Sequence, residues 1–141
     1  MKILQRIKAT SVTPPAAIVD NAAFTTASVD CKDVQEVTFV VYLGALDIAL
    51  SAFKLRESDD DSSYSDVSGA DFSASLPAAT DDNKVYAIHV SNMSGRKRYL
   101  DLSLTGGDGA AGTYATVIAL TVPKAEPSTA TTRGYAAELI V

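Results

Sequence analysis

Apolar residues recur along this chain with a period of two, which is the spacing of side chains on one face of a β-strand. In residues 34–43, VQEVTFVVYL, every second position from Val37 to Leu43 is apolar, and the positions between them are mostly apolar as well. We expect this segment to be a central strand that is covered on both faces. Residues 49–58, ALSAFKLRES, alternate in the same way and predict the returning strand.

Three later segments also alternate. Residues 84–92 (KVYAIHVSN) and 113–122 (TYATVIALTV) predict two strands, and in the second of these the larger side chains are expected on the face opposite Ala115, Val117 and Ala119. Residues 98–105 (RYLDLSLT) place leucine at every second position, which predicts a half-exposed strand. Residues 23–30 and 135–141 are weaker candidates.

No window shows the apolar spacing of a capped helix, and the connections are rich in Gly, Ser, Asp, Asn and Pro. These patterns predict an all-β fold, an antiparallel β-sandwich or jelly-roll-like barrel with extended N- and C-terminal segments. A length of 141 residues fits one domain, with an N-terminal arm over 1–22, a β core over 23–122, and a linker and C-terminal strand over 123–141. Each end is expected either to add a strand to a neighbour's sheet or to form an edge strand of its own domain.

Charge is concentrated in one loop. The formal net charge is −5, and residues 57–71 hold six of the 17 acidic residues and no Lys or Arg, which leaves 12 basic against 11 acidic residues elsewhere. This balance argues against a nucleic-acid partner, which would require a basic face. The single cysteine, Cys31, excludes an internal disulfide, and we expect it half-buried. No apolar run is long enough for a signal peptide or a membrane span, so we expect a soluble chain without a membrane partner.

Candidate chemistry is weak throughout. In SDDDSSYSDVSG (58–69) the acidic residues are adjacent rather than alternating, so they diverge instead of converging on calcium, and a solvated hairpin tip is favoured. GGDGAAG (106–112) lacks the Lys-Ser/Thr of a phosphate loop, and His89 has no nucleophile context. We therefore predict no catalytic, metal or cofactor site. GRKR (95–98) reads either as an ordinary charged turn or as a contact to an acidic partner surface.

Several stretches together resemble a known family: SVDCKDVQEVTFVVYLGAL, LRESDDDSSYSDVSGADF, TDDNKVYAIHV, GRKRYLDLSLT and TYATVIALTVPKAEP, spanning about residues 28–125. They are similar to small virion proteins of tailed bacteriophages, the head decoration or cement proteins. The resemblance implies a trimer that clamps neighbouring major capsid subunits on the outer capsid surface, after synthesis in the host cytoplasm. It also implies that Glu57, Ser58, Asp59 and Asp60 form a hairpin turn without a catalytic role. Relatives often have glycine after these acidic residues, where this chain has Asp61.

The sequence hypothesis is therefore a non-enzymatic phage protein that decorates and cements the capsid. The alternatives are a tail or baseplate accessory protein and a carbohydrate-binding β-sandwich, although the latter usually presents stacked aromatics and this chain has no Trp. The residues expected to contact capsid or subunit lie at both ends and in the basic cluster: Lys2, Arg6, Lys8, Arg96, Lys97, Arg98, Leu139, Ile140 and Val141.

Overall fold

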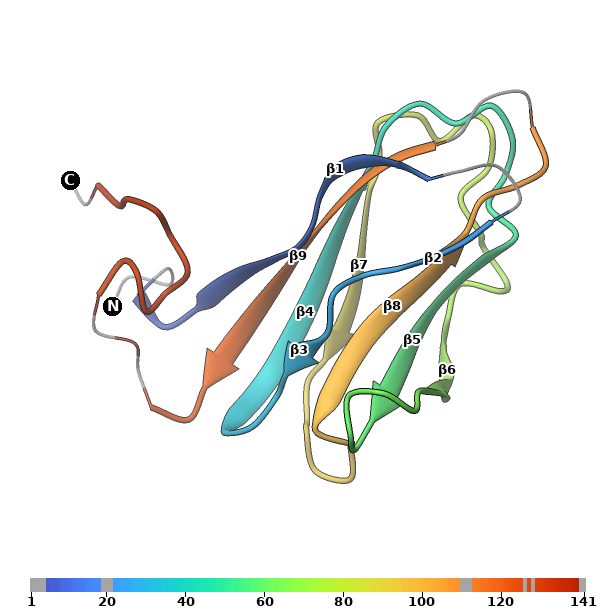
Figure 1. Ribbon diagram of the computed structural model, residues 1–141. Coiled ribbons are helices and arrows are strands. Elements are labelled where there is room, and N and C mark those ends of the chain that lie inside the picture. Colours follow the sequence, from blue (N-terminus) through green and yellow to red (C-terminus); the bar gives the residue numbers. More distant parts are fainter. Residues whose placement is uncertain (1–4, 19–21, 110–112, 126, 128, 140–141) are drawn as a thin grey trace.

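The computed structural model of the chain describes residues 5–18, 22–109, 113–125, 127 and 129–139 (Figure 1). The described part contains strands and no α-helix. The strands are β1 (Lys8–Ile18), β2 (Ala23–Thr25), β3 (Val29–Asp30), β4 (Val34–Leu43), β5 (Ala52–Ser58), β6 (Ser65–Asp71), β7 (Val85–Val90), β8 (Tyr99–Thr105) and β9 (Thr113–Pro123).

The strands form two antiparallel sheets that pack face to face. We call the four-stranded sheet, with the order β1-β9-β4-β7, sheet A, and the other sheet, with the order β2-β8-β5-β6 and β3 also paired to β8, sheet B. The two sheets do not join into a closed barrel. The predicted all-β antiparallel sandwich is confirmed, and the barrel alternative is not found.

The core lies between the sheets and follows the alternation of the sequence. Val37, Phe39 and Val41 of β4 are 0% exposed, and so are Leu100 and Leu102 of β8. A cluster of rings closes one end of the core, because Phe53 lies 4.6 Å from Phe72 and Tyr86 lies 5.8 Å from Phe72, between ring centroids. The inward face of β9 contributes the small residues Ala115, Val117 and Ala119.

The exposure of three strands bears on the sequence predictions. β4 is central within sheet A, but only one of its faces is covered, since Tyr42 on the other face is 45% exposed. β8 was expected to be half-exposed, yet Asp101 and Ser103 on its outer side are buried at 3% and 6%. β8 lies between β2 and β5, and charged side chains from β5 cover this outer side. On β9 the larger residues face outward, as predicted.

The two terminal segments differ from each other. The predicted N-terminal arm contains β1, which pairs with β9 through two register shifts as an edge strand of sheet A, so the edge-strand alternative is confirmed here. Of the predicted C-terminal strand over 135–141, residues 135–139 are described and form no strand. They follow a series of turns over 129–134 instead, and this segment projects beyond the start of β1, away from both sheets (Figure 1).

Candidate functional site

The outer faces of the two sheets differ in chemistry. The outer face of sheet B carries ion pairs between neighbouring strands. Lys54 Nζ lies 2.6 Å from Asp66 Oδ2, and the Arg56 guanidinium donates two hydrogen bonds, of 2.9 and 2.5 Å, to the Asp101 carboxylate. This face is therefore charged and solvated. Its charged side chains form ion pairs and hydrogen bonds with one another.

The outer face of sheet A is mostly apolar over β4, β7 and β9. Register places Tyr42 beside Val85 and Thr116 in one row across the sheet, and Val40 beside Ala87 and Ile118 in the next. A third row joins His89, Thr38 and Leu120, and Val122 follows opposite Glu36. We define the apolar face as the seven outward apolar residues of these rows: Val40, Tyr42, Val85, Ala87, Ile118, Leu120 and Val122.

These side chains are in contact with solvent. Val85, Tyr42 and Ile118 are 61%, 45% and 42% exposed. In the rows from Tyr42 to Glu36 of β4, β7 and β9, the ionisable side chains are Glu36, His89 and the phenol of Tyr42, and His89 Nδ1 lies 2.6 Å from Thr38 Oγ1. An antiparallel sheet that faces water normally alternates apolar-in and polar-out. A contiguous apolar patch on such a face is typical of an interaction surface.

The acidic hairpin between β5 and β6 is held together by its own hydrogen bonds. The Asp60 carboxylate accepts bonds from the backbone N–H groups of Ser62 (3.0 Å) and Ser63 (2.8 Å) and from the Ser58 hydroxyl (2.8 Å). These bonds, the Ser63 N–H first, hold the pKa of Asp60 well below its usual range. Asp61 adopts φ = 57°, the left-handed conformation that glycine favours, so it occupies the backbone conformation expected of the glycine that the resemblance places there.

The acidic hairpin forms a turn whose carboxylates have partners within the chain. Among the described residues, no three His, Cys, Asp or Glu side chains are grouped so that they could hold a metal ion. Asp61 accepts a 2.5 Å bond from the Tyr64 hydroxyl, and Asp59 lies 3.6 Å from Lys97. Adjacent aspartates therefore point to different partners, as their spacing in the sequence indicates.

The basic cluster lies beside this hairpin and forms ion pairs with acidic residues of the same chain. Arg96 Nη1 lies 3.6 Å from Glu57, and Arg98 forms a two-bond pair with Asp30, at 2.8 and 2.6 Å. Hydrogen bonding to Arg98 is the largest cause that lowers the pKa of Asp30 to about 2. The cluster serves as a charged turn in its own chain, and a contact of the same side chains with a partner stays a prediction.

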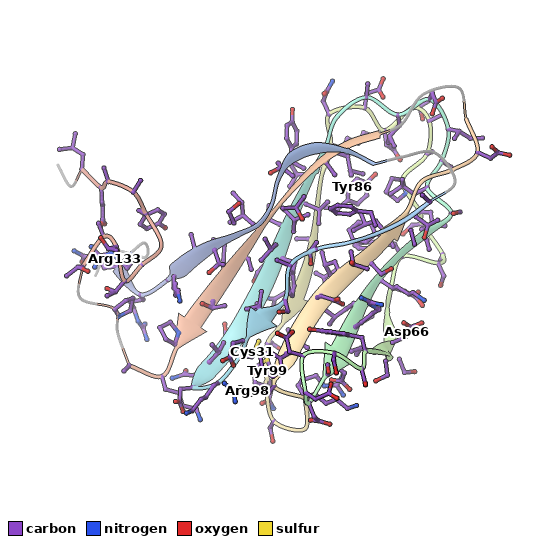
Figure 2. All side chains as sticks on the ribbon, in the orientation of Figure 1. Cys31, Asp66, Tyr86, Arg98, Tyr99 and Arg133 are labelled. Carbon is purple, nitrogen blue, oxygen red and sulfur yellow. The ribbon has the colours of Figure 1, made fainter. Side chains whose placement is uncertain are left out.

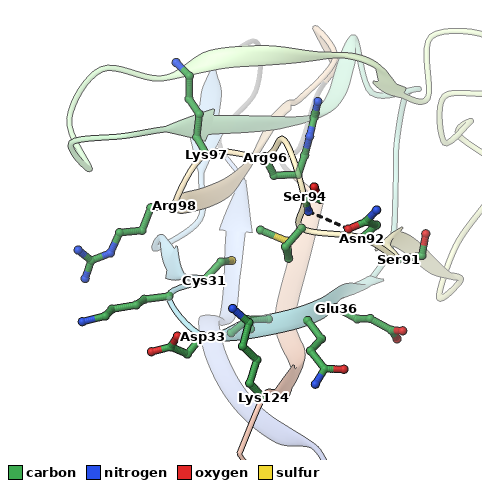
Figure 3. Close-up of a pocket in the computed structure, with 14 residues that line it drawn as sticks. Cys31, Asp33, Glu36, Ser91, Asn92, Ser94, Arg96, Lys97, Arg98 and Lys124 are labelled. Atoms are coloured by element: carbon green, nitrogen blue, oxygen red, sulfur yellow. Dashed lines mark hydrogen bonds between the residues drawn. The ribbon is translucent and has the colours of Figure 1, made fainter.

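These basic residues also line a cleft of about 780 Å³ at the end of the sandwich (Figure 3). The cleft is bounded by Arg96 on one side and by Asp33 and Lys124 on the other, with Cys31 near its centre. Cys31 is 6% exposed, deeper than expected, and burial raises the pKa of its thiol to about 12. A thiol with this pKa is protonated at neutral pH and is not a nucleophile.

The remaining predicted contact residues lie at the chain ends. Arg6 and Lys8 are exposed at the start of β1, and Leu139 is 88% exposed at the end of the projecting segment. Lys2, Ile140 and Val141 lie outside the described residues. The basic cluster joins β7 to β8, whereas the turns around Arg133 adjoin β1 at the other edge of sheet A, so Arg98 and Arg133 lie apart (Figure 2).

The fold has a counterpart among solved structures. The crystal structure of the PBSX exported protein XepA aligns with 92% of this chain at a TM-score of 0.57 and 17% sequence identity. The likeness is one of fold. This chain covers 41% of the length of that protein, so it corresponds to a part of it. No protein-family model matches the sequence, and no curated protein sequence matches it. No helix of the described residues is long and apolar enough to cross a membrane.

The apolar face is the surface that sequence reasoning missed. Its signal was present, because both faces of the segment 34–43 are mostly apolar. The pattern was interpreted as a strand covered twice by its own domain, whereas the structure covers it once. The exposed face is therefore apolar without a partner in the described part of the chain.

Proposed function

We propose that this protein is a structural component of a phage virion, which decorates the outer capsid surface and cements it by bridging major capsid protein subunits. The observation that carries the proposal is the apolar face of sheet A. A rigid sandwich with one charged, internally paired face and one apolar face has the arrangement expected of a protein that attaches to another polypeptide. The sequence resemblance to head decoration proteins supplies the identity of that partner, and the shared fold with a phage exported protein supports a phage origin.

The size of the apolar face fits a role in multivalent attachment. The seven residues 36–42 along β4, with a rise of about 3.3 Å each, and three strands spaced about 4.8 Å apart give a planar area of about 300 Å². A stable interface between two proteins buries about 800 Å² on each partner. One copy would therefore bind weakly, and several linked copies on adjacent capsid subunits would bind strongly through their effective concentration. This is the physical basis for acting as a trimer.

The proposed role is non-enzymatic. The buried polar side chains of the described residues form hydrogen bonds or ion pairs within the fold, and none is left unpaired and directed into a cavity. The cleft at the end of the sandwich contains a thiol with a raised pKa and charged residues that pair with their neighbours. The proposed role requires that the apolar face is buried against a partner.

Binding to heads tests the proposal. Empty heads assembled from the major capsid protein of the same phage are incubated with the purified chain and pelleted. Val85→Asp places a carboxylate on the apolar face at a site that is 61% exposed, so it costs little folding stability. Because burying an unpaired carboxylate in an interface costs at least 2 kcal/mol, or about 30-fold in affinity, we expect this variant to remain in the supernatant.

Ile48→Asp is the matched control, since Ile48 is 38% exposed and lies outside the apolar face. It should pellet like the unaltered chain. Equal pelleting of Val85→Asp and Ile48→Asp, with both folded, would remove the apolar face from the proposal. Failure of the unaltered chain to bind heads, with binding to tails or to glycans instead, would replace the proposal with one of the alternatives.

A further inference from the structure

One lateral side of the sandwich is left open. β6 is the last strand of sheet B and β7 is the last strand of sheet A, and within the described chain no backbone hydrogen bond joins them. On the opposite side the two sheets are linked, because the Ala27 N–H donates a 3.0 Å bond to the Val12 carbonyl. The open side therefore presents two unpaired strand edges, which are able to accept a further strand.

A groove of about 270 Å³ lies between these two edges. Its apolar lining comes from both sheets, namely Leu55, Val67, Ala70, Ile88 and Val90. Farther along the same side, Phe72 and Tyr86 pack at 5.8 Å between ring centroids and fill the corresponding space. The groove is thus the part of this side that the chain's own aromatic residues do not close.

The C-terminal segment presents an apolar side chain to solvent from a well-anchored base. The Arg133 side chain is 8% exposed and pairs with Glu138, and it also donates a 3.1 Å bond to the Pro127 carbonyl. The Ala9 N–H donates a 2.7 Å bond to the Arg133 carbonyl, which fixes the segment to β1. Despite this anchoring, Leu139 is 88% exposed. The buried Arg133–Glu138 pair anchors the segment, but the Leu139 side chain itself gains no burial within one copy.

We propose that Leu139 inserts into the β6–β7 groove of a second copy of this chain. A cavity of about 150 Å³ holds a benzene ring, so a groove of this size accepts one or two branched aliphatic side chains.

The occupant is a second copy because the segment points away from its own groove. It is fixed to β1, the first strand of sheet A, whereas the groove adjoins β7, the last strand of the same sheet (Figure 1). Donor and acceptor lie on different surfaces, so the contact is heterologous and leads from each copy to the next. Such a contact closes into a ring when the rotation permits, and three copies would form the expected trimer. This contact is independent of what the apolar face binds.

Sedimentation velocity of the purified chain, without capsids, tests the contact at concentrations up to about 1 mM, because one to two buried aliphatic side chains give weak association. Leu139→Asp removes the donor, and Ala70→Phe fills the acceptor groove. Each is expected to weaken self-association about 10- to 100-fold, which is the effect of losing one buried aliphatic side chain. Ile48→Asp, at a site apart from donor and groove, is the control and should associate like the unaltered chain.

Mixing the two altered chains distinguishes this contact from any other. Leu139→Asp keeps an intact groove and Ala70→Phe keeps an intact donor, so the mixture should form a heterodimer that neither forms alone. A second measurement does not depend on the folding of Ala70→Phe. A mixture of Leu139→Cys with Ala70→Cys should form an intermolecular disulfide between the two new cysteines. Native Cys31 should not compete, because it is buried and protonated. A monomeric unaltered chain, no effect of Leu139→Asp, or no disulfide in the mixture would each overturn the proposal. None of these results depends on head binding.

Discussion

The ion pair between Arg56 and Asp101 gives a prediction whose magnitude follows from burial. Asp101 lies on the central strand β8, and its side chain is 5% exposed, while that of Arg56 is 23% exposed. The guanidinium donates two bonds to the carboxylate and stacks over the Tyr64 ring at 5.1 Å. Arg56→Met preserves much of the aliphatic side chain and leaves the carboxylate buried without its cation.

The expected cost is large. Removing one partner of a buried pair costs about 3–5 kcal/mol, because the other charge stays desolvated. The free energy of unfolding of a domain is about 5–15 kcal/mol, so Arg56→Met should remove about a fifth of it or more. The matched control is Lys54→Met, two residues away on the same face. The Lys54–Asp66 pair is 36% and 57% exposed, and such pairs contribute at most about 1 kcal/mol.

Urea unfolding measures both variants, followed by circular dichroism because the chain has no Trp. Arg56→Met should unfold at a much lower urea concentration than Lys54→Met. The double variant Arg56→Met, Asp101→Leu should recover most of the loss, because an apolar pair of similar volume replaces a buried ion pair at little cost. If Arg56→Met costs less than about 1 kcal/mol, or no more than Lys54→Met, then Asp101 is hydrated and the reasoning from burial is wrong.

Two further predictions concern the exposed parts of the fold. Hydrogen bonding to Arg98 lowers the pKa of Asp30 to about 2, so this pair stabilises the fold above the unfolded-state pKa of about 3.9 and loses that contribution as pH falls toward 2. Arg98→Gln should therefore flatten the loss of stability between about pH 4 and pH 2 in acid titrations, and an unchanged titration would contradict the assignment. Gly134 has φ = 84°, and a Cβ there would collide with the Ala9 carbonyl, whereas Gly95 has φ = 80° with open space around it. Gly134→Ala should therefore release the C-terminal segment to trypsin cleavage after Arg133. Gly95→Ala is the control: it introduces only backbone strain, of about 1 kcal/mol, and should leave the segment protected. Equal cleavage of the two variants would show that the contact with β1 does not hold the segment.

The strands were predictable because their signal is local. In the segments 34–43, 84–92 and 98–105, successive side chains alternate between the two faces of a strand. Val37, Phe39 and Leu102 are buried in the structure, as this alternation indicates. The hairpin tip was predictable because its signal is also local, since Asp and Ser side chains bond to the backbone of the turn in which they lie. The position of Asp61 in a left-handed turn shows that a polar residue meets a backbone requirement that glycine usually meets.

Pairing between distant residues could not be predicted. Arg98 and Asp30 are 68 residues apart, and Arg56 and Asp101 are 45 residues apart, so no local pattern joins them. The basic cluster and the acidic hairpin were distinct features of the sequence, and the fold brings them together through the adjacent ends of β5 and β8. The apolar residues of 135–141 indicate a strand, but residues 135–139 form none.

The sequence by itself determined that this protein is built of alternating β-strands, because the geometry of a strand translates residue order directly into two faces. Only the tertiary structure decided which of those faces is covered. Val40, Tyr42 and Ile118 are as apolar as many core residues, and nothing in their order states whether a neighbouring sheet or a different molecule covers them. Burial depends on what packs against a side chain, and that is set by strand pairing across the whole chain.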